Sequence, residues 1–304
     1  MIARAALAVV AVLTGCAAAT PSTAPSQASS DAAGPSPSAD PPPPLTLGAG
    51  FRYSTYGIGP IDPGPEYWRR VGEEMAARFD GAKPGAVWIV GEIAGQGTVL
   101  TFPGTSDEPT IHFRPEDNNE AALDLFDEAG FDVWLQVEPA NAPIDQLIDI
   151  ILDRYGHHPS VVGVGIDVEW LGASGSPEGR PVTDAEAREW VAAVRAHDPG
   201  YRLFLKHWER DVMPPTERDG IVFIDDSQGF ADLEAMVAEF AVWGEHFAPS
   251  QVGFQFGYLG DRPWWGGLAD PPSDIGAALL DAVPNVAGLY WVDFTVREIF
   301  EPAE

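Results

Sequence analysis

The chain of 304 residues carries a formal net charge of −29, with 46 Asp and Glu against 17 Lys and Arg. Nucleic-acid binding depends on basic side chains that neutralise phosphates, so this balance argues against a nucleic-acid partner and against adsorption to anionic lipid. One cysteine cannot form an internal disulfide, so the hydrophobic residues, 45% of the chain, must supply the stability.

The first 15 residues have the pattern of an export signal. Arg4 precedes an apolar run from Ala5 to Leu13, and small residues precede Cys16. The run is far shorter than the ~20 apolar residues that span a bilayer. The segment 13–16, Leu-Thr-Gly-Cys, resembles the bacterial lipobox, which implies cleavage after residue 15 and a lipid such as palmitate on Cys16. An ordinary signal peptide with a chance cysteine is the alternative.

Residues 16–47 are predicted to form a disordered tether. They are rich in Ser, Pro and Ala, contain almost no large apolar side chain, and include four consecutive prolines at 41–44. Such a segment buries too little surface to offset its ordering entropy, and the prolines keep it extended. We expect a protein anchored to the outer face of the cell membrane through lipid alone, with the folded domain over 48–304.

Apolar strand patterns alternate with helical patterns through this domain. Strands are predicted over 51–56, 86–93, 131–138, 161–170, 201–208, 221–226, 251–258 and 286–293. Helices are predicted over 65–79, 118–129, 144–155, 184–196, 231–247 and 275–282. Thr183 and Glu186 form a capping-box pattern at the start of the fourth helix. The segment 213–215, Met-Pro-Pro, is poor for a helix.

Alternating strands and helices predict a parallel sheet with helical crossovers. Eight strands in one domain of this size match a closed (β/α)8 barrel of the TIM type. A doubly wound open sheet is the alternative, but no Gly-rich phosphate loop of the G-x-G-x-x-G kind follows the first strand.

The strand over 161–170 carries the most informative polar residues. Side chains alternate between the two faces of a strand, so Val162, Val164 and their alternates are expected to face the helices. Asp167 and Glu169 are then expected to face inward, at the end of the barrel where catalytic groups lie. Neighbouring carboxylates repel, which raises the pKa of one of them and keeps it protonated. A proton donor beside a second carboxylate is suited to glycosidic cleavage, although an ion pair with Lys206 would be a merely structural role.

This strand resembles the D-G-x-D-x-D-x-E signature of glycoside hydrolase family 18, the group of chitinases and endo-N-acetylglucosaminidases. The match places Glu169 at the acid and Asp167 beside it, whereas Val162 and Gly165 replace two aspartates of the family. Asp226 matches the aspartate of the M-x-Y-D motif, in which Asp225 replaces the tyrosine. The resemblance implies that Glu169, Asp167 and Asp226 are catalytic, and Tyr258 is a candidate for the missing tyrosine. A muramidase of family 25, which also carries D-x-E, is a related possibility.

Other residues at strand ends are expected to bind the sugar. The resemblance extends to residues 288–293, where it implies that the Trp291 ring stacks beneath the reacting sugar. The expected substrate-binding residues are Trp291, Trp208, Gln136, Glu138, Gln255 and Asp293. The adjacent Trp264 and Trp265 are expected in an exposed loop. His157 and His158 are expected on the surface without a third ligand nearby, so neither a metal site nor a cofactor is predicted.

The sequence thus predicts a monomeric cell-surface glycosidase acting on an extracellular or cell-wall glycan. A non-catalytic glycan-binding lipoprotein on a degenerate hydrolase barrel is the first alternative, because family aspartates and the tyrosine are missing. A lipoprotein that holds a basic protein partner on its aromatic rim is the second.

Overall fold

The computed structural model describes residues 44–173 and 179–301. The expected signal peptide, Cys16 and all but the last few residues of the expected tether lie outside these ranges. In the described ranges no helix combines the length and the apolar character needed to cross a membrane.

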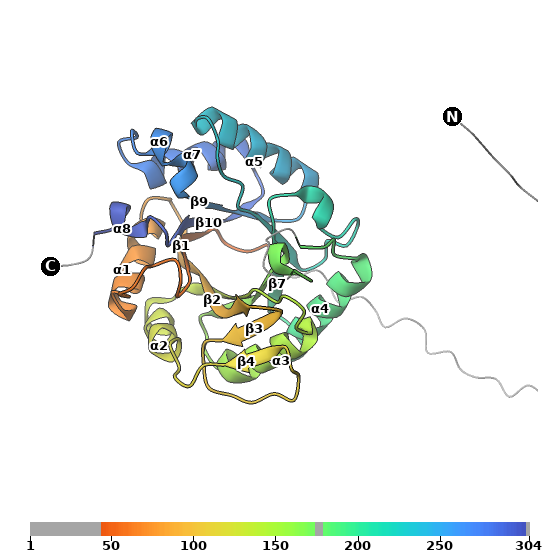
Figure 1. The fold of residues 1–304 in the computed structure, drawn as a ribbon. Helices are drawn as coiled ribbons and strands as arrows, with labels where there is room; N and C mark the ends of the chain where they lie inside the picture. The colour runs from red at the N-terminus through yellow and green to blue at the C-terminus, as the bar shows by residue number, and fades with distance from the viewer. Residues whose placement is uncertain (1–43, 174–178, 302–304) are drawn as a thin grey trace, which may run out of the picture. The chain divides into compact units, whose positions relative to one another are not determined.

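Eight parallel strands close into a barrel surrounded by helices (Figure 1). They are β1 (Gly48–Tyr53), β2 (Lys83–Ala94), β5 (Asp132–Val137), β6 (Val161–Asp167), β7 (Arg202–Lys206), β8 (Ile221–Asp225), β9 (Val252–Phe256) and β10 (Val286–Val292). β1 pairs in parallel with both β2 and β10, and this pairing closes the sheet. The TIM-type (β/α)8 fold is therefore confirmed, and the open doubly wound alternative is wrong.

The helices lie on the outside of the strands. They are α1 (Pro65–Ala76), α2 (Glu120–Ala129), α3 (Ile144–Tyr155), α4 (Asp184–His197), α5 (Leu233–Phe247), α6 (Arg262–Trp265), α7 (Pro271–Ala282) and α8 (Val296–Ile299). The capping box of α4 is present, since Thr183 and Glu186 exchange side-chain and backbone hydrogen bonds. Between β7 and β8 the described chain forms only a short 3-10 turn, Arg210–Val212, as the prolines at 214 and 215 predict.

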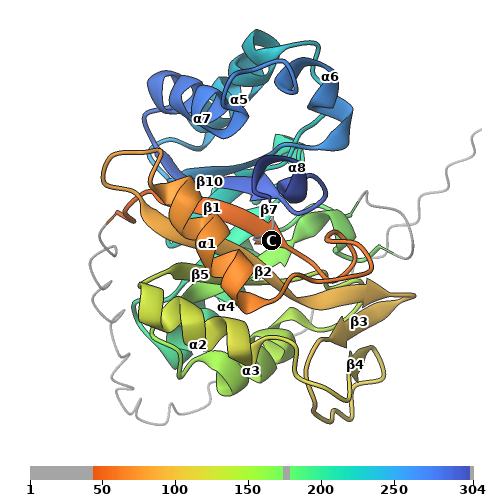
Figure 2. The same cartoon turned by 90° about the vertical axis from the view of Figure 1, so that its left-hand side faces the viewer.

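A small extension was not predicted from the sequence. β2 continues to Ala94 and turns back into the antiparallel β3 (Gly97–Leu100), which β4 (Ile111–Phe113) then joins in parallel. Figure 2 shows β3 beside the end of β2 and β4 next to β3, at one edge of the barrel. Because β2 ends in this hairpin, Glu92 and Ile93 extend past the neighbouring strands and reach the wall of the mouth pocket described below.

Two apolar cores hold the fold together. The larger lies between strands and helices, and the smaller fills the barrel. The smaller core consists of Val87, Trp134, Phe204, Val222, Ile224 and Tyr290. Gly165 leaves room for Phe204, because a Cβ atom at position 165 would lie 1.9 Å from Phe204 Cζ. Apolar side chains therefore fill the barrel interior.

Strand β6 departs from its prediction in two ways. Its pairing with β5 skips Val162, so Val162 packs against the core inside the barrel instead of facing the helices with Val164. The strand also ends at Asp167, and Val168–Trp170 form a 3-10 turn. Glu169 therefore projects from the turn after the strand, while Asp167 remains within the barrel wall.

Candidate active site

Three carboxylates surround one buried lysine at the carboxyl end of the barrel. Lys206, at the end of β7, has its Nζ 3.2 Å from Asp167 Oδ2 and 2.6 Å from Asp226 Oδ2. The same ammonium donates a hydrogen bond to Glu169 Oε1. Lys206 is 3% exposed, and none of the three acids is more than 8% exposed. The three expected catalytic acids are thus brought together, with Lys206 at their centre.

The acids of this cluster differ in their affinity for protons. Burial, followed by the charge of Asp226, raises the pKa of Glu169 to about 10. Burial also opposes ionisation of Asp226, but the Lys206 ammonium outweighs it and lowers the pKa of Asp226 below its ordinary value. Glu169 and Asp226 also share a hydrogen bond, in which the protonated acid must be the donor. The arrangement therefore holds a proton on Glu169 beside an ionised Asp226 at neutral pH.

Asp167 is intermediate between these two acids. Burial raises its pKa to about 7, with contributions from the charges of Glu138 and Asp226, while Lys206 acts in the opposite direction. Gln136 Nε2 donates to Asp167 Oδ2 over 3.0 Å and fixes the carboxylate. Burial favours neutral Lys206, but the surrounding carboxylates outweigh it and raise the pKa of Lys206 well above its ordinary value. The lysine therefore stays charged.

Tyr258 lies beside the cluster, as predicted. Its hydroxyl is 3.3 Å from Asp226 Oδ2 and 3.4 Å from Gln255 Oε1, so it donates to one of these acceptors. Gln255 is fully buried beneath it. Tyr258 follows β9 directly, which places its hydroxyl over the acids although it is not on the strand that the family motif would use.

A second network of hydrogen-bonded polar side chains lies in the wall of the mouth pocket. Arg52 donates to Asp293 Oδ1 over 2.6 Å and to the Tyr56 hydroxyl over 2.5 Å. Tyr56 in turn donates to Glu138 Oε1 over 2.5 Å. Asp293 also accepts from the backbone and hydroxyl of Ser54. Asp293 holds Arg52 and is not among the residues that line the mouth pocket, so it positions this wall and does not form its surface.

Two cavities meet at the acids. The mouth pocket, of about 500 Å³, is lined by Arg52, Tyr56, Glu92, Ile93, Glu138, Asp167, Glu169, Trp170, Lys206, Asp226, Gln228, Tyr258 and Phe294. A second cavity, of about 390 Å³, is lined by Glu169, Trp208, Asp226, Ser227 and Gln228. Glu169, Asp226 and Gln228 line both cavities, so a molecule that occupies the two cavities together contacts the pair of acids.

The expected sugar-binding aromatics are only partly in place. Trp208 lines the second cavity. Trp291 is fully buried, packs against Phe256 and Trp265, and donates to Thr295 Oγ1 over 2.9 Å. The expectation that Trp291 stacks beneath the sugar is wrong, because alternation along β10 turns Trp291 toward the helices and Tyr290 toward the barrel interior.

The exposed tryptophan pair is also not found. Trp265 is 2% exposed in α6, and its indole nitrogen donates to the Tyr258 carbonyl, while Trp264 is half-buried. Tyr56 and Phe294, 48% and 41% exposed, form the aromatic rim of the mouth pocket instead. Trp170 also lines this pocket.

Several of these lining residues were missed by the sequence reasoning. Arg52 falls in an apolar strand, and its position opposite Asp293 follows only from closure of the barrel. Tyr56 and Phe294 follow strand ends, which is the signal that would have found them. Asp225, by contrast, faces away from the pocket with Phe223, and burial raises its pKa to about 8.

The comparisons with known proteins concern the fold. No family model matches the chain, and no curated protein resembles it significantly. Among solved structures it is similar to the β-glucuronidase of Bacteroides uniformis, with 16% identity and a TM-score of 0.49 over 81% of this chain and 30% of that chain. The β-glucuronidase of Parabacteroides merdae has 12% identity and a TM-score of 0.47 over 81% of this chain and 31% of that chain. The β-glucuronidase of an uncultured Clostridium sp. has 14% identity and a TM-score of 0.43 over 82% of this chain and 44% of that chain. The chain spans less than half the length of these enzymes, and the similarity assigns no role to any residue.

Proposed function

We propose that the chain is a cell-surface lipoprotein whose barrel hydrolyses glycosidic bonds in an extracellular or cell-wall glycan, with Glu169 as the general acid. The observation that carries this proposal is a buried Glu169 held beside Asp226 and Lys206 where two cavities meet, in surroundings that raise the pKa of Glu169 and lower that of Asp226. A confined carboxylic acid that keeps its proton at neutral pH beside an anionic carboxylate is the arrangement that glycosidic cleavage requires.

The reaction follows from these protonation states. Glu169 transfers its proton to the glycosidic oxygen while the bond between that oxygen and the anomeric carbon breaks. Positive charge develops on the sugar, and the ionised Asp226 stabilises it, with Asp167 contributing in its ionised form. Water supplies hydroxide to the anomeric carbon and returns a proton to Glu169. Lys206 keeps Asp226 ionised through this cycle.

The shape of the site supports a polymeric substrate. Glu169 and Asp226 line both the mouth pocket and the second cavity, so sugars on both sides of the cleaved bond can be accommodated. Trp208 lines one cavity, and Tyr56 and Phe294 line the other. Aromatic faces of this kind stack on the apolar faces of sugars.

One observation favours the alternative of a glycan-binding lipoprotein without catalysis. Lys206 contacts Glu169 as well as Asp167 and Asp226, so the ammonium occupies part of the acid's hydrogen-bonding capacity. If the ion pairs with Lys206 prevent the three acids from transferring a proton, the aromatic walls would still bind sugar, but no glycosidic bond would be cleaved.

Activity on a panel of cell-wall and environmental polysaccharides distinguishes the two functions. The wild-type chain should release reducing ends from at least one of them, and Glu169→Gln should lower that rate by about 100-fold or more. Glu128→Gln, an exposed residue of α2, is the matched control and should retain the wild-type rate. Binding of a glycan without product release would establish the alternative, and full activity of Glu169→Gln would end the assignment of the acid.

The anchor is tested separately. Cells expressing the wild-type chain and fed a palmitate analogue should incorporate it into the protein, and Cys16→Ala should abolish both incorporation and retention in the membrane fraction. An unlabelled wild-type chain would leave an ordinary export signal as the explanation of residues 1–15.

A further inference from the structure

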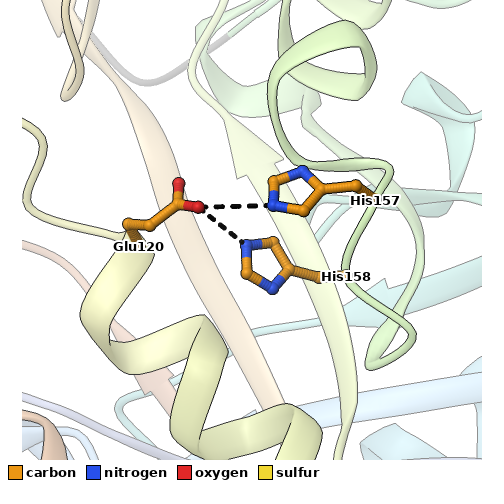
Figure 3. A group of neighbouring side chains, drawn as sticks. All are labelled: Glu120, His157 and His158. Atoms are coloured by element: carbon orange, nitrogen blue, oxygen red, sulfur yellow. Dashed lines mark ion pairs between the residues drawn. The ribbon is translucent and has the colours of Figure 1, made fainter.

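A cluster outside the barrel mouth has the geometry of a metal-binding site. Glu120 is the first residue of α2, and His157 and His158 lie in the turn between α3 and β6 (Figure 3). Glu120 Oε1 is 3.3 Å from His157 Nε2 and 3.5 Å from His158 Nε2. The candidate ligand atoms all lie within 4.8 Å of one another. The expectation that this histidine pair lacks a third ligand is therefore wrong, because α2 brings Glu120 alongside it.

The second nitrogen of each ring fixes the state of the first. His158 Nδ1 lies 2.7 Å from Asp127 Oδ2, and His157 Nδ1 lies 3.0 Å from the Arg154 carbonyl oxygen. Both partners are acceptors, so each Nδ1 carries the proton, and in a neutral ring Nε2 presents a lone pair. Both Nε2 atoms face the Glu120 carboxylate in Figure 3.

The two Nε2 atoms and the Glu120 carboxylate present acceptors to one another, so a cation can bind between them. His158 is 2% exposed, and its Nε2 has no hydrogen-bond partner within the described ranges. A buried polar atom without a partner costs free energy. One divalent metal ion satisfies all three ligand atoms at once.

We propose that Glu120, His157 and His158 bind one divalent transition metal, with Zn²⁺ the ion that best suits the donors. Two imidazole nitrogens and one carboxylate oxygen are a common zinc set, and metal–ligand bonds of about 2.1 Å in tetrahedral geometry separate ligand atoms by about 3.4 Å. The observed separations from Glu120 Oε1 match this value. Asp127 supplies the outer carboxylate that orients a ligating histidine.

The local charge also suits a cation. Arg154 lies 3.5 Å from Glu120 Oε2, but its closer partner is Asp117, at 2.7 Å. Asp124 and Asp127 approach His158 from the same face of α2. Acidic groups thus outnumber the guanidinium around the cluster. The bound ion would tie the first turn of α2 to the turn that precedes β6, independently of the barrel mouth.

Calorimetric titration of the metal-stripped chain with ZnCl₂ tests the site. The wild type should bind one equivalent, and His157→Gln, which removes an exposed ligand, should weaken binding at least tenfold, as should Glu120→Gln. Asp127→Asn should weaken it by about 10–100-fold through the orientation of His158. His197→Gln is the matched control, because His197 pairs with Asp149 and Asp153 but brings only one imidazole.

Visible absorption with Co²⁺ as the probe provides a second measurement. The wild type and His197→Gln should show the intense bands of a tetrahedral ion, and His157→Gln should lose them. The site is refuted if the wild type shows no saturable binding. It is equally refuted if His157→Gln and Glu120→Gln bind Zn²⁺ as tightly as the wild type.

Discussion

Replacing Lys206 by Met removes the one side-chain cation, among the residues that the structure describes, that contacts Asp167, Glu169 and Asp226. Removing one partner of a buried ion pair costs about 3–5 kcal/mol, and we expect a loss in this range at pH 8. The lowered pKa of Asp226 contributes stability above about pH 4, the unfolded value, and the substitution abolishes that contribution. Without the ammonium, burial raises the pKa of Asp167 beyond about 7 and that of Asp226 above its ordinary value, and both acids then cost stability as the pH increases above about 4. The loss should therefore be smaller at pH 5 than at pH 8.

Urea denaturation followed by circular dichroism at the two pH values measures this difference. Lys83, the only other lysine, provides the control, since it is exposed and pairs with Asp132 at 3.1 Å. Lys83→Met should cost no more than about 1 kcal/mol at either pH. Equal losses for Lys206→Met at pH 5 and pH 8, or a loss as small as that of Lys83→Met, would refute the account of the cluster.

Three further substitutions test other features. Burial of the Asp225 carboxylate lowers the stability of the fold increasingly as the pH rises from about 4 to its folded-state pKa of about 8. Asp225→Asn should therefore raise the free energy of unfolding by about 1–3 kcal/mol at pH 8 and leave it nearly unchanged at pH 4. Gly165→Ala should lower the free energy of unfolding in urea by about 1–3 kcal/mol, because its methyl group would collide with Phe204. An unchanged denaturation midpoint would mean that the core inside the barrel has room for a methyl group. Phe294→Ala should lower the free energy of unfolding by at most about 1 kcal/mol, because Phe294 is partly exposed, but it should raise the KM for glycan. Trp291→Phe should lower the free energy of unfolding by about 2 kcal/mol, because it removes a buried hydrogen bond, and should leave KM unchanged. The reverse pattern would restore Trp291 to the site.

The order of strands and helices was predictable because each carries a local signal. Pro65 and the Thr183–Glu186 capping box begin helices where the sequence places them. The β3–β4 extension escaped prediction because its strands are short and pair through the edge of β2. The skipped pairing at Val162 escaped it because a bulge depends on the partner strand, not on the alternation within one strand.

The candidate site was predictable to the extent that its residues follow strand ends. Asp167, Glu169, Asp226 and Tyr258 were found in this way, since closure of a parallel barrel gathers such positions. The family motif predicts Trp291 in the site, whereas alternation along β10 turns it into the core under the helices. The pairing of Glu120 with His157 depends on how α2 packs beside α3, which no local pattern encodes.

The parallel pairing of β1 with β10 means that the barrel cannot close until nearly the whole chain is available. Arg52 and Asp293, which join the two strands at the mouth, are 241 positions apart. During synthesis one edge of β1 therefore stays unpaired until β10 emerges, and contacts between such distant segments form slowly. Any truncation before β10 removes Asp293, leaves Arg52 buried without its carboxylate, and exposes the edges of β1 and β9 to pairing with other chains. We expect such fragments to aggregate, and the mouth to be assembled last.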